Sequence, residues 1–268
     1  MDKKSKIILI SGPTASGKSS FAVNLAGKIN GEIINADSMQ VYKEVKILTA
    51  RPSIKDQKKI KHHLYGFQSV KKNFSTGDWL KLATQKIDQI KKSKKVPILV
   101  GGTGLYFKAL TEGLVEITPI PSNFRNKVRL LQKTIGQTKF YKKLLKLDPA
   151  IVNYVRSSDV QRSIRAFEVK SFTKKSITEW NQNTKSKFKN KEFMKLCIDY
   201  PRSELVEKIN NRVMQMINTG AILEVKRFSR LRISKNKSIS KAIGLSEIKD
   251  FIKKKIDKED VIEKISIK

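Results

Sequence analysis

Residues 12–19 constrain this chain more than any other stretch, because they fit the phosphate-binding pattern G-x-x-x-x-G-K-[ST]. The apolar run at residues 7–10 predicts a buried parallel strand before the motif, and residues 20–26 place apolar side chains at helical spacing after it. A chance glycine-rich turn, the alternative interpretation, would not require this strand and helix. The sequence therefore predicts a P-loop, a motif typical of nucleotide- and ATP-binding proteins.

The P-loop predicts a site for a diphosphate or a nucleotide. Two glycines let the backbone curl so that N–H groups face anionic oxygens above the positive end of a helix. Lys18 adds a mobile charge, and the Ser19 hydroxyl is placed to complete the ligand shell of Mg²⁺, which we expect as cofactor. The expected diphosphate-binding residues are Gly12, Pro13, Thr14, Ala15, Ser16, Gly17, Lys18 and Ser19.

The charge of the chain predicts a polyanionic partner. The 268 residues include 57 Lys plus Arg against 24 Asp plus Glu, a formal net charge of +33 that is spread along the sequence. Such a balance gives salt-dependent affinity for nucleic acid, although solvated surface lysines are the alternative explanation. A chain of this length can bury a substantial core, either as one large domain or as a core with a smaller insertion.

Cysteine usage and hydropathy limit the compartment. Cys197 is the single cysteine, so no disulfide scaffold exists, and its strand-like surroundings predict a small buried hydrophobic residue. Too few apolar residues precede the P-loop for a signal peptide, and no apolar run approaches the length of a membrane span. We expect a cytoplasmic monomer without a membrane partner.

Two further segments follow predicted strands and reach the P-loop edge of the sheet, where open α/β sheets bind ligands. Asp37 comes directly after the strand at residues 32–35, so it is either a functional carboxylate beside Lys18 or a turn-capping residue. Residues 101–106 follow the strand at residues 96–100 and carry glycines and Thr103 where an ATPase would show a metal-binding Asp. We expect these glycines to allow close backbone approach to a ligand, and the Thr103 hydroxyl to donate to a phosphate or a base.

The overall prediction is an α/β fold, with a P-loop NTPase-like parallel sheet flanked by helices and an inserted helical domain. Residues 1–115 and 191–268 form the predicted core, and residues 116–190 the insertion, which has few strand signals. A capping-box pattern at residues 75–78 predicts a helix start in the core, and a second one at residues 158–161 predicts a helix start in the insertion. That helix would bury Val160, Ile164 and Phe167 and present Gln161, Arg162 and Arg165 on the opposite side, where they suit phosphates or bases, unless this is simply a solvated face.

A later helix, after Pro201, places Leu205, Ile209, Val213 and Met216 on its inward face. Arg202 and Arg212 on this helix could complete the anion site. Surface salt bridges to neighbouring glutamates are an equal alternative.

Taken together, these segments closely resemble the tRNA dimethylallyltransferase family over nearly the whole chain. The resemblance rests on the P-loop and on five further segments, at residues 33–42, 62–64, 97–106, 161–166 and 242–244. It implies transfer of a dimethylallyl group from dimethylallyl diphosphate to the exocyclic amine of the adenosine immediately 3′ of the anticodon. The substrates would be tRNAs that read codons starting with U.

The resemblance also implies roles for individual residues. The P-loop would hold a prenyl diphosphate instead of ATP, with Lys18 and Mg²⁺ stabilising the departing diphosphate. Asp37 would accept the amine proton, and Thr103 would join Asp37 and Lys18 in the catalytic set. The insertion would contact the anticodon stem-loop, whose adenosine must be flipped out of its stack. The residues expected to bind tRNA are Asp37, Ser38, Met39, Gln40, Thr103, Arg125, Gln161, Arg162, Ser163, Ile164 and Arg165.

Two departures from the family pattern modify these expectations. Leu48 stands where the family usually has glycine in Gly-Thr-Ala-Lys-Pro, so we expect an altered loop geometry there. Family members also continue into a basic, aromatic C-terminal segment beyond the point where this sequence ends, so we expect some tRNA contacts to be missing. A small-molecule or nucleoside kinase and a non-catalytic RNA-binding descendant remain alternative functions.

Overall fold

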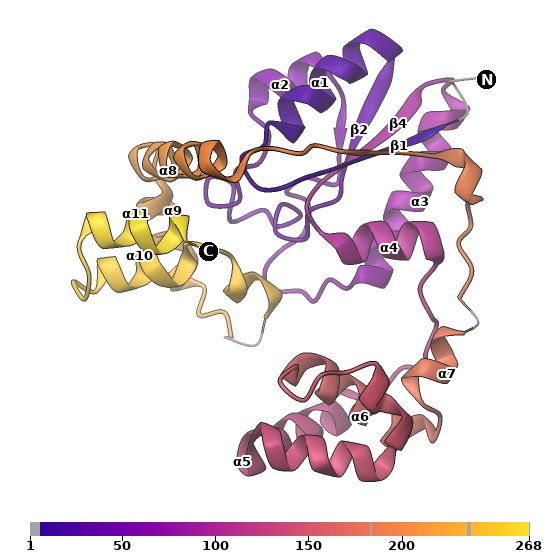
Figure 1. The fold of residues 1–268 in the computed structure, drawn as a ribbon. Helices are drawn as coiled ribbons and strands as arrows, with labels where there is room; N and C mark the ends of the chain where they lie inside the picture. The colour runs from indigo at the N-terminus through magenta and orange to yellow at the C-terminus, as the bar shows by residue number, and fades with distance from the viewer. Residues whose placement is uncertain (1–5, 183, 235–236, 268) are drawn as a thin grey trace. The chain divides into compact units, whose positions relative to one another are not determined.

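The computed structural model describes residues 6–182, 184–234 and 237–267. The chain divides into two compact units. The first, here called the α/β unit, combines residues 1–111 with residues 188–268, and the second, the helical unit, comprises residues 112–187 (Figure 1). The chain therefore leaves the α/β unit once and later returns to complete it.

The α/β unit is built on a parallel five-stranded sheet, which confirms the predicted fold class. Its strand order is β3-β2-β4-β1-β5. Ile98 lies at the centre, in register with Ile8 on one side and Ile33 on the other. Strands covered on both faces favour continuous apolar runs, as seen here. The strands are β1 (Ile7–Ser11), β2 (Gly31–Asn35), β3 (His62–His63), β4 (Val96–Val100) and β5 (Phe193–Cys197).

Helices cover both faces of this sheet. Helix α1 (Lys18–Ile29) packs Ala22 and Ala26 on one face, and α3 (Thr76–Lys92) and α4 (Gly104–Glu112) cover the other. The predicted capping box of Ser75 and Asp78 begins α3, where each residue accepts from the backbone of the other. The short helix α2 (Ile54–Lys59) precedes β3. All three main helices are amphipathic toward the sheet, so burial of their apolar faces holds this layer arrangement together.

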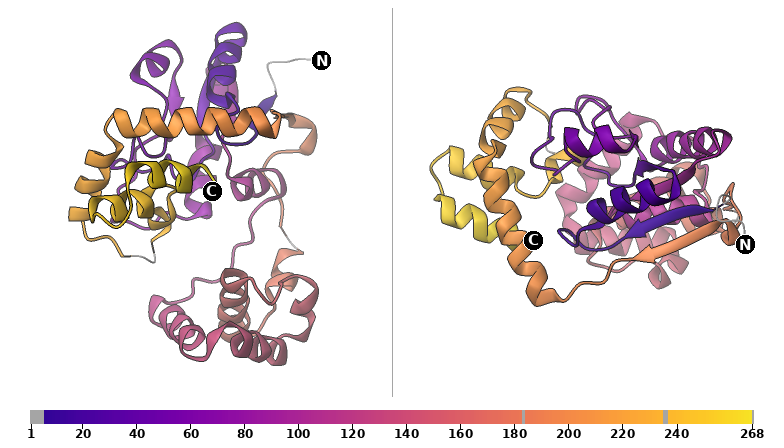
Figure 2. Two further views of the ribbon diagram at one scale, coloured as in Figure 1. Left: turned by 60° about the vertical axis from the view of Figure 1, so that its left-hand side comes forward. Right: turned by 90° about the horizontal axis from the view of Figure 1, so that it is seen from above.

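The C-terminal part of the α/β unit is helical. Helices α8 (Arg202–Asn218), α9 (Ala221–Arg230), α10 (Leu245–Ile252) and α11 (Lys258–Ser266), with the 3₁₀ helix η4 (Ser238–Lys241), gather around one apolar core (Figure 2). The segment that follows β2 contributes Val41, Val45 and Leu48 to that core. These helices are therefore attached to the sheet through the loop that continues from Asp37.

The helical unit contains α5 (Ser122–Leu147), η2 (Pro149–Asn153), α6 (Val160–Thr173) and α7 (Ile177–Asn181). Helix α5 bends at Gly136, whose φ of 75° lies in the left-handed region that glycine tolerates. The capping-box prediction at residues 158–161 was wrong in detail. The side chain of Asp159, and not that of Ser158, caps α6 by accepting a hydrogen bond from the Arg162 N–H at 2.9 Å.

The expectation that Cys197 is buried was wrong. Among the described strands, β5 pairs only with β1 and lies at the edge of the sheet, and the Cys197 thiol at its end is exposed. Across the described ranges, the helices are all too short or too polar to cross a bilayer.

Candidate active site

The P-loop joins β1 to α1 through backbone conformations that side chains rarely adopt. Gly17 caps α1 with a φ of 81°, and Ala15 has a φ of 62°. Gly12 has a φ of 153°, and a Cβ there would lie 2.8 Å from the carbonyl oxygen of Ile198, against which the loop packs. The glycines at both ends are thus required by the turn, and the loop opens above the N-terminus of α1 as the motif predicted.

The charged group of the P-loop lies in a partly desolvated environment. The Lys18 ammonium donates to the Pro13 carbonyl across the loop. Burial lowers the pKa of Lys18, the nearby Arg212 charge lowers it further, and Asp37 raises it. Burial also lowers the pKa of Arg212, again offset by Asp37. Two cations that face one carboxylate leave an excess of positive charge, which an anionic ligand would neutralise.

The Ser16 hydroxyl also indicates a ligand at the P-loop. The residue is 6% exposed, and its hydroxyl oxygen is buried without a hydrogen-bond partner among the described residues. A buried donor without a partner carries a desolvation cost, which a phosphate oxygen would offset.

Asp37 is held firmly at the mouth of the sheet. Its Oδ1 accepts from the N–H groups of Met39 at 2.8 Å and Gln40 at 3.4 Å. The fully buried Asn35 fixes the backbone on both sides, because its Oδ1 accepts from the Asp37 N–H at 2.9 Å and its Nδ2 donates to the Asp37 carbonyl at 2.9 Å. Asn35 Nδ2 also reaches the Leu64 carbonyl at 3.0 Å. Asp37 is therefore a capping residue and a pocket-facing carboxylate together.

Thr103 connects the turn after β4 to the Asp37 segment. Its Oγ1 accepts from the Ser38 N–H at 2.9 Å and lies 3.3 Å from the Ser38 hydroxyl, to which it can donate. A Cβ at Gly101 would lie 2.1 Å from the carbonyl oxygen of Ala36. At Gly101 the close approach is therefore made by the protein's own backbone, whereas a Cβ at Gly102 or Gly104 would meet nothing within 4 Å.

Residues 46–51 form a loop whose backbone is held by hydrogen bonds to two side chains. The Glu224 carboxylate on α9 accepts from the N–H groups of Lys46, Ile47 and Leu48 at 2.7, 2.9 and 2.8 Å. Gln40 Nε2 donates to the carbonyls of Thr49 at 2.9 Å and Ala50 at 3.2 Å. The positive φ in this loop falls on Ala50 and not on Leu48. A side chain is therefore accommodated at position 48 without backbone strain.

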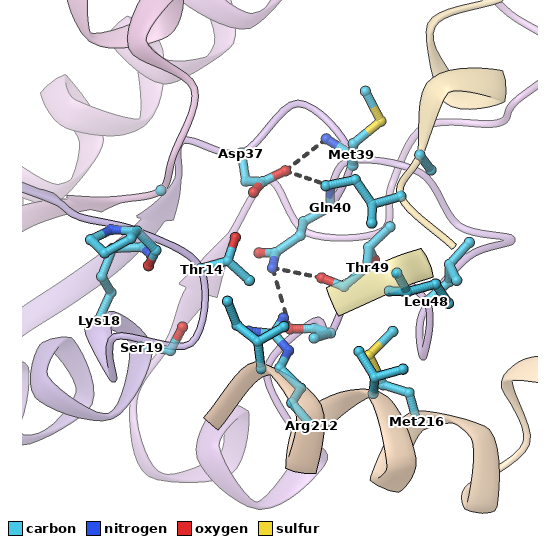
Figure 3. A pocket seen from close by; sticks show the side chains of 18 of the residues that line it. Thr14, Lys18, Ser19, Asp37, Met39, Gln40, Leu48, Thr49, Arg212 and Met216 are labelled. Carbon is cyan, nitrogen blue, oxygen red and sulfur yellow. Dashed lines mark hydrogen bonds between the residues drawn. The ribbon is translucent and has the colours of Figure 1, made fainter. Parts of the chain in front are cut away.

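These elements enclose a pocket of about 440 Å³ within the α/β unit. Figure 3 shows Lys18 and Ser19 on one side, with Leu48 and Met216 on the side away from them. The polar lining includes Thr14, Lys18, Ser19, Asp37, Gln40 and Arg212, and the apolar wall includes Leu48, Leu205, Ile209, Val213, Met216 and Ile243. The pocket thus combines an anion-binding end with a hydrophobic end.

The sequence analysis predicted Leu205, Ile209, Val213 and Met216 as an inward helix face but did not assign them to a pocket wall. The apolar spacing of α8 indicated a buried helix face. Nothing in the local sequence pattern linked this face to Leu48 or to Ile243, which lies before α10. Arg202 and Arg212 were predicted either to complete the anion site or to form surface salt bridges. Arg212 lines the pocket, whereas Arg202 is exposed and is not among the lining residues.

The predicted RNA contacts of the insertion lie on α5 and α6 of the helical unit. Glu168, which is 1% exposed, is approached by the guanidinium groups of Arg125 at 3.2 Å, Arg129 at 3.6 Å and Arg165 at 3.7 Å. Burial lowers the pKa of Arg165, and Glu168 raises it. Three half-exposed guanidiniums around one carboxylate keep a net positive charge at this surface.

Other members of the predicted RNA-binding run occupy different environments. Gln161 and Arg162 are exposed, and Arg162 pairs with Asp159 at 3.5 Å. Ser163 is fully buried and Ile164 is 8% exposed in the core of the helical unit. Both side chains are turned toward α5, since Gln137 donates to the Ser163 hydroxyl at 3.1 Å and Ile164 packs with Val128 and Phe140.

Comparisons with known proteins agree with this geometry. The family model described as IPP transferase matches residues 40–268. The tRNA dimethylallyltransferase of Pelagibacter ubique is 60% identical over 268 residues, which cover all of this chain and 86% of that protein. The tRNA dimethylallyltransferase of Allorhizobium ampelinum is 38% identical over 99% of this chain and 88% of its own.

Solved structures show the same similarity. The tRNA isopentenylpyrophosphate transferase of Bacillus halodurans matches with a TM-score of 0.66 and 30% identity, covering 98% of this chain and 82% of that one. A eukaryotic dimethylallyltransferase acting on tRNA matches with a TM-score of 0.82 and 28% identity, covering 98% of this chain and 66% of that one.

Proposed function

The chain belongs to the IPP transferase family, and from this premise and the pocket we propose its reaction. It is a tRNA dimethylallyltransferase, as are its relatives that align over almost its full length. We infer that it transfers the five-carbon dimethylallyl group to the exocyclic amine of the adenosine immediately 3′ of the anticodon. The expected substrates are tRNAs that read codons starting with U.

One observation carries the choice of donor: the P-loop and an apolar wall line the same pocket. A prenyl diphosphate has a strongly anionic end and a hydrocarbon end, and it therefore matches both sides of the pocket. The adenosine of ATP would place ring nitrogens and ribose hydroxyls against side chains such as Leu205 and Ile209, which cannot pair with them. The P-loop is thus proposed to hold dimethylallyl diphosphate instead of ATP.

The proposed chemistry needs residues that stabilise the leaving diphosphate and a residue that accepts a proton. The adenine amine attacks the first carbon of the dimethylallyl group, the carbon–oxygen bond breaks, and diphosphate leaves with the bonding electrons. Lys18, Arg212 and the P-loop amides would stabilise the negative charge that grows on the diphosphate. Asp37 would take the proton that the amine loses, since its Oδ2 makes no hydrogen bond among the described residues.

Mg²⁺ is a proposed cofactor whose ligands would be mainly substrate oxygens. Among the described residues, no three His, Cys, Asp or Glu side chains gather as a metal cluster. Ser19 lines the pocket beside Lys18 and supplies one hydroxyl, which fits an ion that commonly binds through one or two protein oxygens plus phosphate. When bound, the metal would supply further charge neutralisation for the diphosphate. Thr103 would act by fixing Ser38 next to Asp37.

The proposed macromolecular partner is the tRNA anticodon stem-loop. The +33 charge supports a nucleic-acid partner, as does the cluster of Arg125, Arg129 and Arg165 around Glu168. We further propose that the enzyme acts as a cytoplasmic monomer, which light scattering after size exclusion would check. Two species whose proportions change with protein concentration would contradict the monomeric state.

The test of the proposed function is to incubate the protein with tRNA, Mg²⁺ and dimethylallyl diphosphate, digest the tRNA, and identify the modified nucleoside by mass. Prenylated adenosine next to the anticodon is the expected product. Bound tRNA without any product would favour the non-catalytic RNA-binding alternative. Phosphate transfer from labelled ATP to a nucleoside, with no prenyl transfer, would favour the kinase.

Asp37→Asn provides the matched variant for the mechanism. It retains the side-chain shape and the Oδ1 acceptor, so binding of tRNA and donor should change little. Single-turnover prenylation should slow by roughly a hundredfold or more, as loss of a general base tends to do. A near wild-type rate in this variant would remove Asp37 from the proton-transfer step.

A further inference from the structure

Leu48 lies at the hydrophobic end of the pocket, and its position bears on the size of the donor. We propose that Leu48 limits the prenyl chain that the enzyme accepts, so that the five-carbon dimethylallyl diphosphate fits and the ten-carbon geranyl diphosphate does not. This proposal rests on the proposed function, since it concerns the donor of that reaction.

The contacts of Leu48 close the pocket on the side away from the phosphate loop. Leu48 is 6% exposed and lines the pocket, and Figure 3 shows it on the same side as Met216 and across from Lys18. A Cβ built on Gly244 would lie 2.9 Å from Leu48 Cδ1 and 3.1 Å from Ile265 Cδ1. Both methyl groups therefore lie close to the Gly244 backbone, and because Leu48 and Ile265 both line the pocket, apolar side chains form its wall on this side.

The backbone that carries Leu48 is held in place. The Leu48 N–H donates to Glu224 Oε1 at 2.8 Å, and the N–H groups of the two preceding residues donate to Glu224 Oε2. On the other side of Leu48, the Thr49 carbonyl accepts from Gln40 at 2.9 Å. Moving Leu48 aside would break several of these bonds together. A longer chain is thus opposed by a fixed wall and cannot simply push a mobile loop away.

The expected selectivity follows from close packing. An additional isoprene unit that reaches Leu48 must displace a buried side chain with a fixed backbone, and packed interiors resist added volume. A hydrophobic pocket discriminates a single methylene by roughly 10–200-fold. We expect wild-type kcat/KM to favour dimethylallyl over geranyl diphosphate by about 100-fold or more. Shortening Leu48 should reduce this preference.

The experiment measures kcat/KM for both donors, with the same tRNA, in the wild type and in two single variants. Leu48→Ala should raise the geranyl-to-dimethylallyl ratio by about tenfold or more. Ile47→Ala is the matched control, because Ile47 donates from the same loop to the same glutamate but packs in the helical core and is not among the pocket-lining residues. Its ratio should equal that of the wild type.

Each outcome decides the proposal. An unchanged ratio in Leu48→Ala, or an equal rise in Ile47→Ala, would overturn it while wild-type dimethylallyl transfer leaves the proposed function intact. Absence of transfer from either donor in the wild type would instead overturn the function itself. If Leu48→Ala does not fold, Leu48→Val should still raise the ratio by a smaller factor, and no rise in that folded variant would refute the role of Leu48.

Discussion

Asn35 holds the proposed general base in position, and its replacement by alanine should damage both stability and turnover. The side chain is fully buried at the end of β2 and makes three hydrogen bonds, two to the Asp37 backbone and one to the Leu64 carbonyl. Asn35→Ala leaves all three groups without these partners. A buried group that loses its partner costs about 1–3 kcal/mol.

The lower end of that range applies, because Asp37 and Leu64 are only half-buried and water can replace part of what is lost. Three such groups predict a loss of about 3 kcal/mol in the free energy of unfolding, measured by urea titration with an unchanged m-value. The Trp79 indole should be unaffected, since it donates to the backbone carbonyl of Asn35 at 2.8 Å. Single-turnover prenylation, measured under conditions where the variant is folded, should slow by about tenfold or more because Asp37 is no longer fixed.

Two variants serve as controls for this prediction. Asn126→Ala removes an exposed amide on α5 and should stay within about 0.5 kcal/mol of the wild type. Asn35→Asp keeps the acceptor for the Asp37 N–H but turns a carboxylate oxygen toward two carbonyls, so it should be no more stable than Asn35→Ala at neutral pH. A loss below about 1 kcal/mol in Asn35→Ala, together with a wild-type rate, would refute the reasoning.

Three further outcomes are expected. Lys18→Ala should weaken binding of dimethylallyl diphosphate by about 10- to 100-fold in calorimetry, because a charged hydrogen-bond donor is lost; unchanged affinity would exclude Lys18 from the anion site. Arg165→Ala should lower affinity for the anticodon stem-loop and reduce the slope of log K against log salt by about one, and an unaltered slope would argue against a phosphate contact. Burial lowers the pKa of both His62 and His63. The unfolded state therefore binds more protons below about pH 6.5, and the free energy of unfolding should fall on acidification. Urea titrations in which the double variant His62→Gln/His63→Gln shows the same pH dependence as the wild type would contradict this prediction.

The sequence predicted those parts of the α/β unit that depend on local pattern. Apolar runs such as residues 96–100 could only be buried strands beside a P-loop, and parallel strands bring their carboxyl ends to one edge. The strand pattern alone was therefore enough to bring Asp37 and Thr103 together at that edge. The capping box at Ser75 was predicted for a similar reason, since its residues are neighbours in the chain.

Features that depend on tertiary packing could not be predicted in this way. The edge position of β5, which exposes Cys197, is set by strand order and not by the composition of the strand. The apolar wall joins Leu48, α8 and Ile243, and helical periodicity indicates that a face is buried without indicating its neighbours. Similarly, Ser163 is buried because α6 packs on α5, a contact that the motif of residues 161–165 does not encode.

The return of the chain to the α/β unit has a consequence for its synthesis. The Ser11 hydroxyl and the Leu196 carbonyl are hydrogen-bonded across the β1–β5 ladder, yet these residues lie 185 positions apart. At about 5–20 residues per second, a ribosome needs roughly 10–40 s between them. Throughout that interval one edge of β1 lacks its partner strand, whereas α5 and α6 can pair as soon as both have been made. Newly made chains should therefore be most prone to aggregation before Leu196 emerges, and a chaperone that shields this strand edge should raise the yield of folded enzyme.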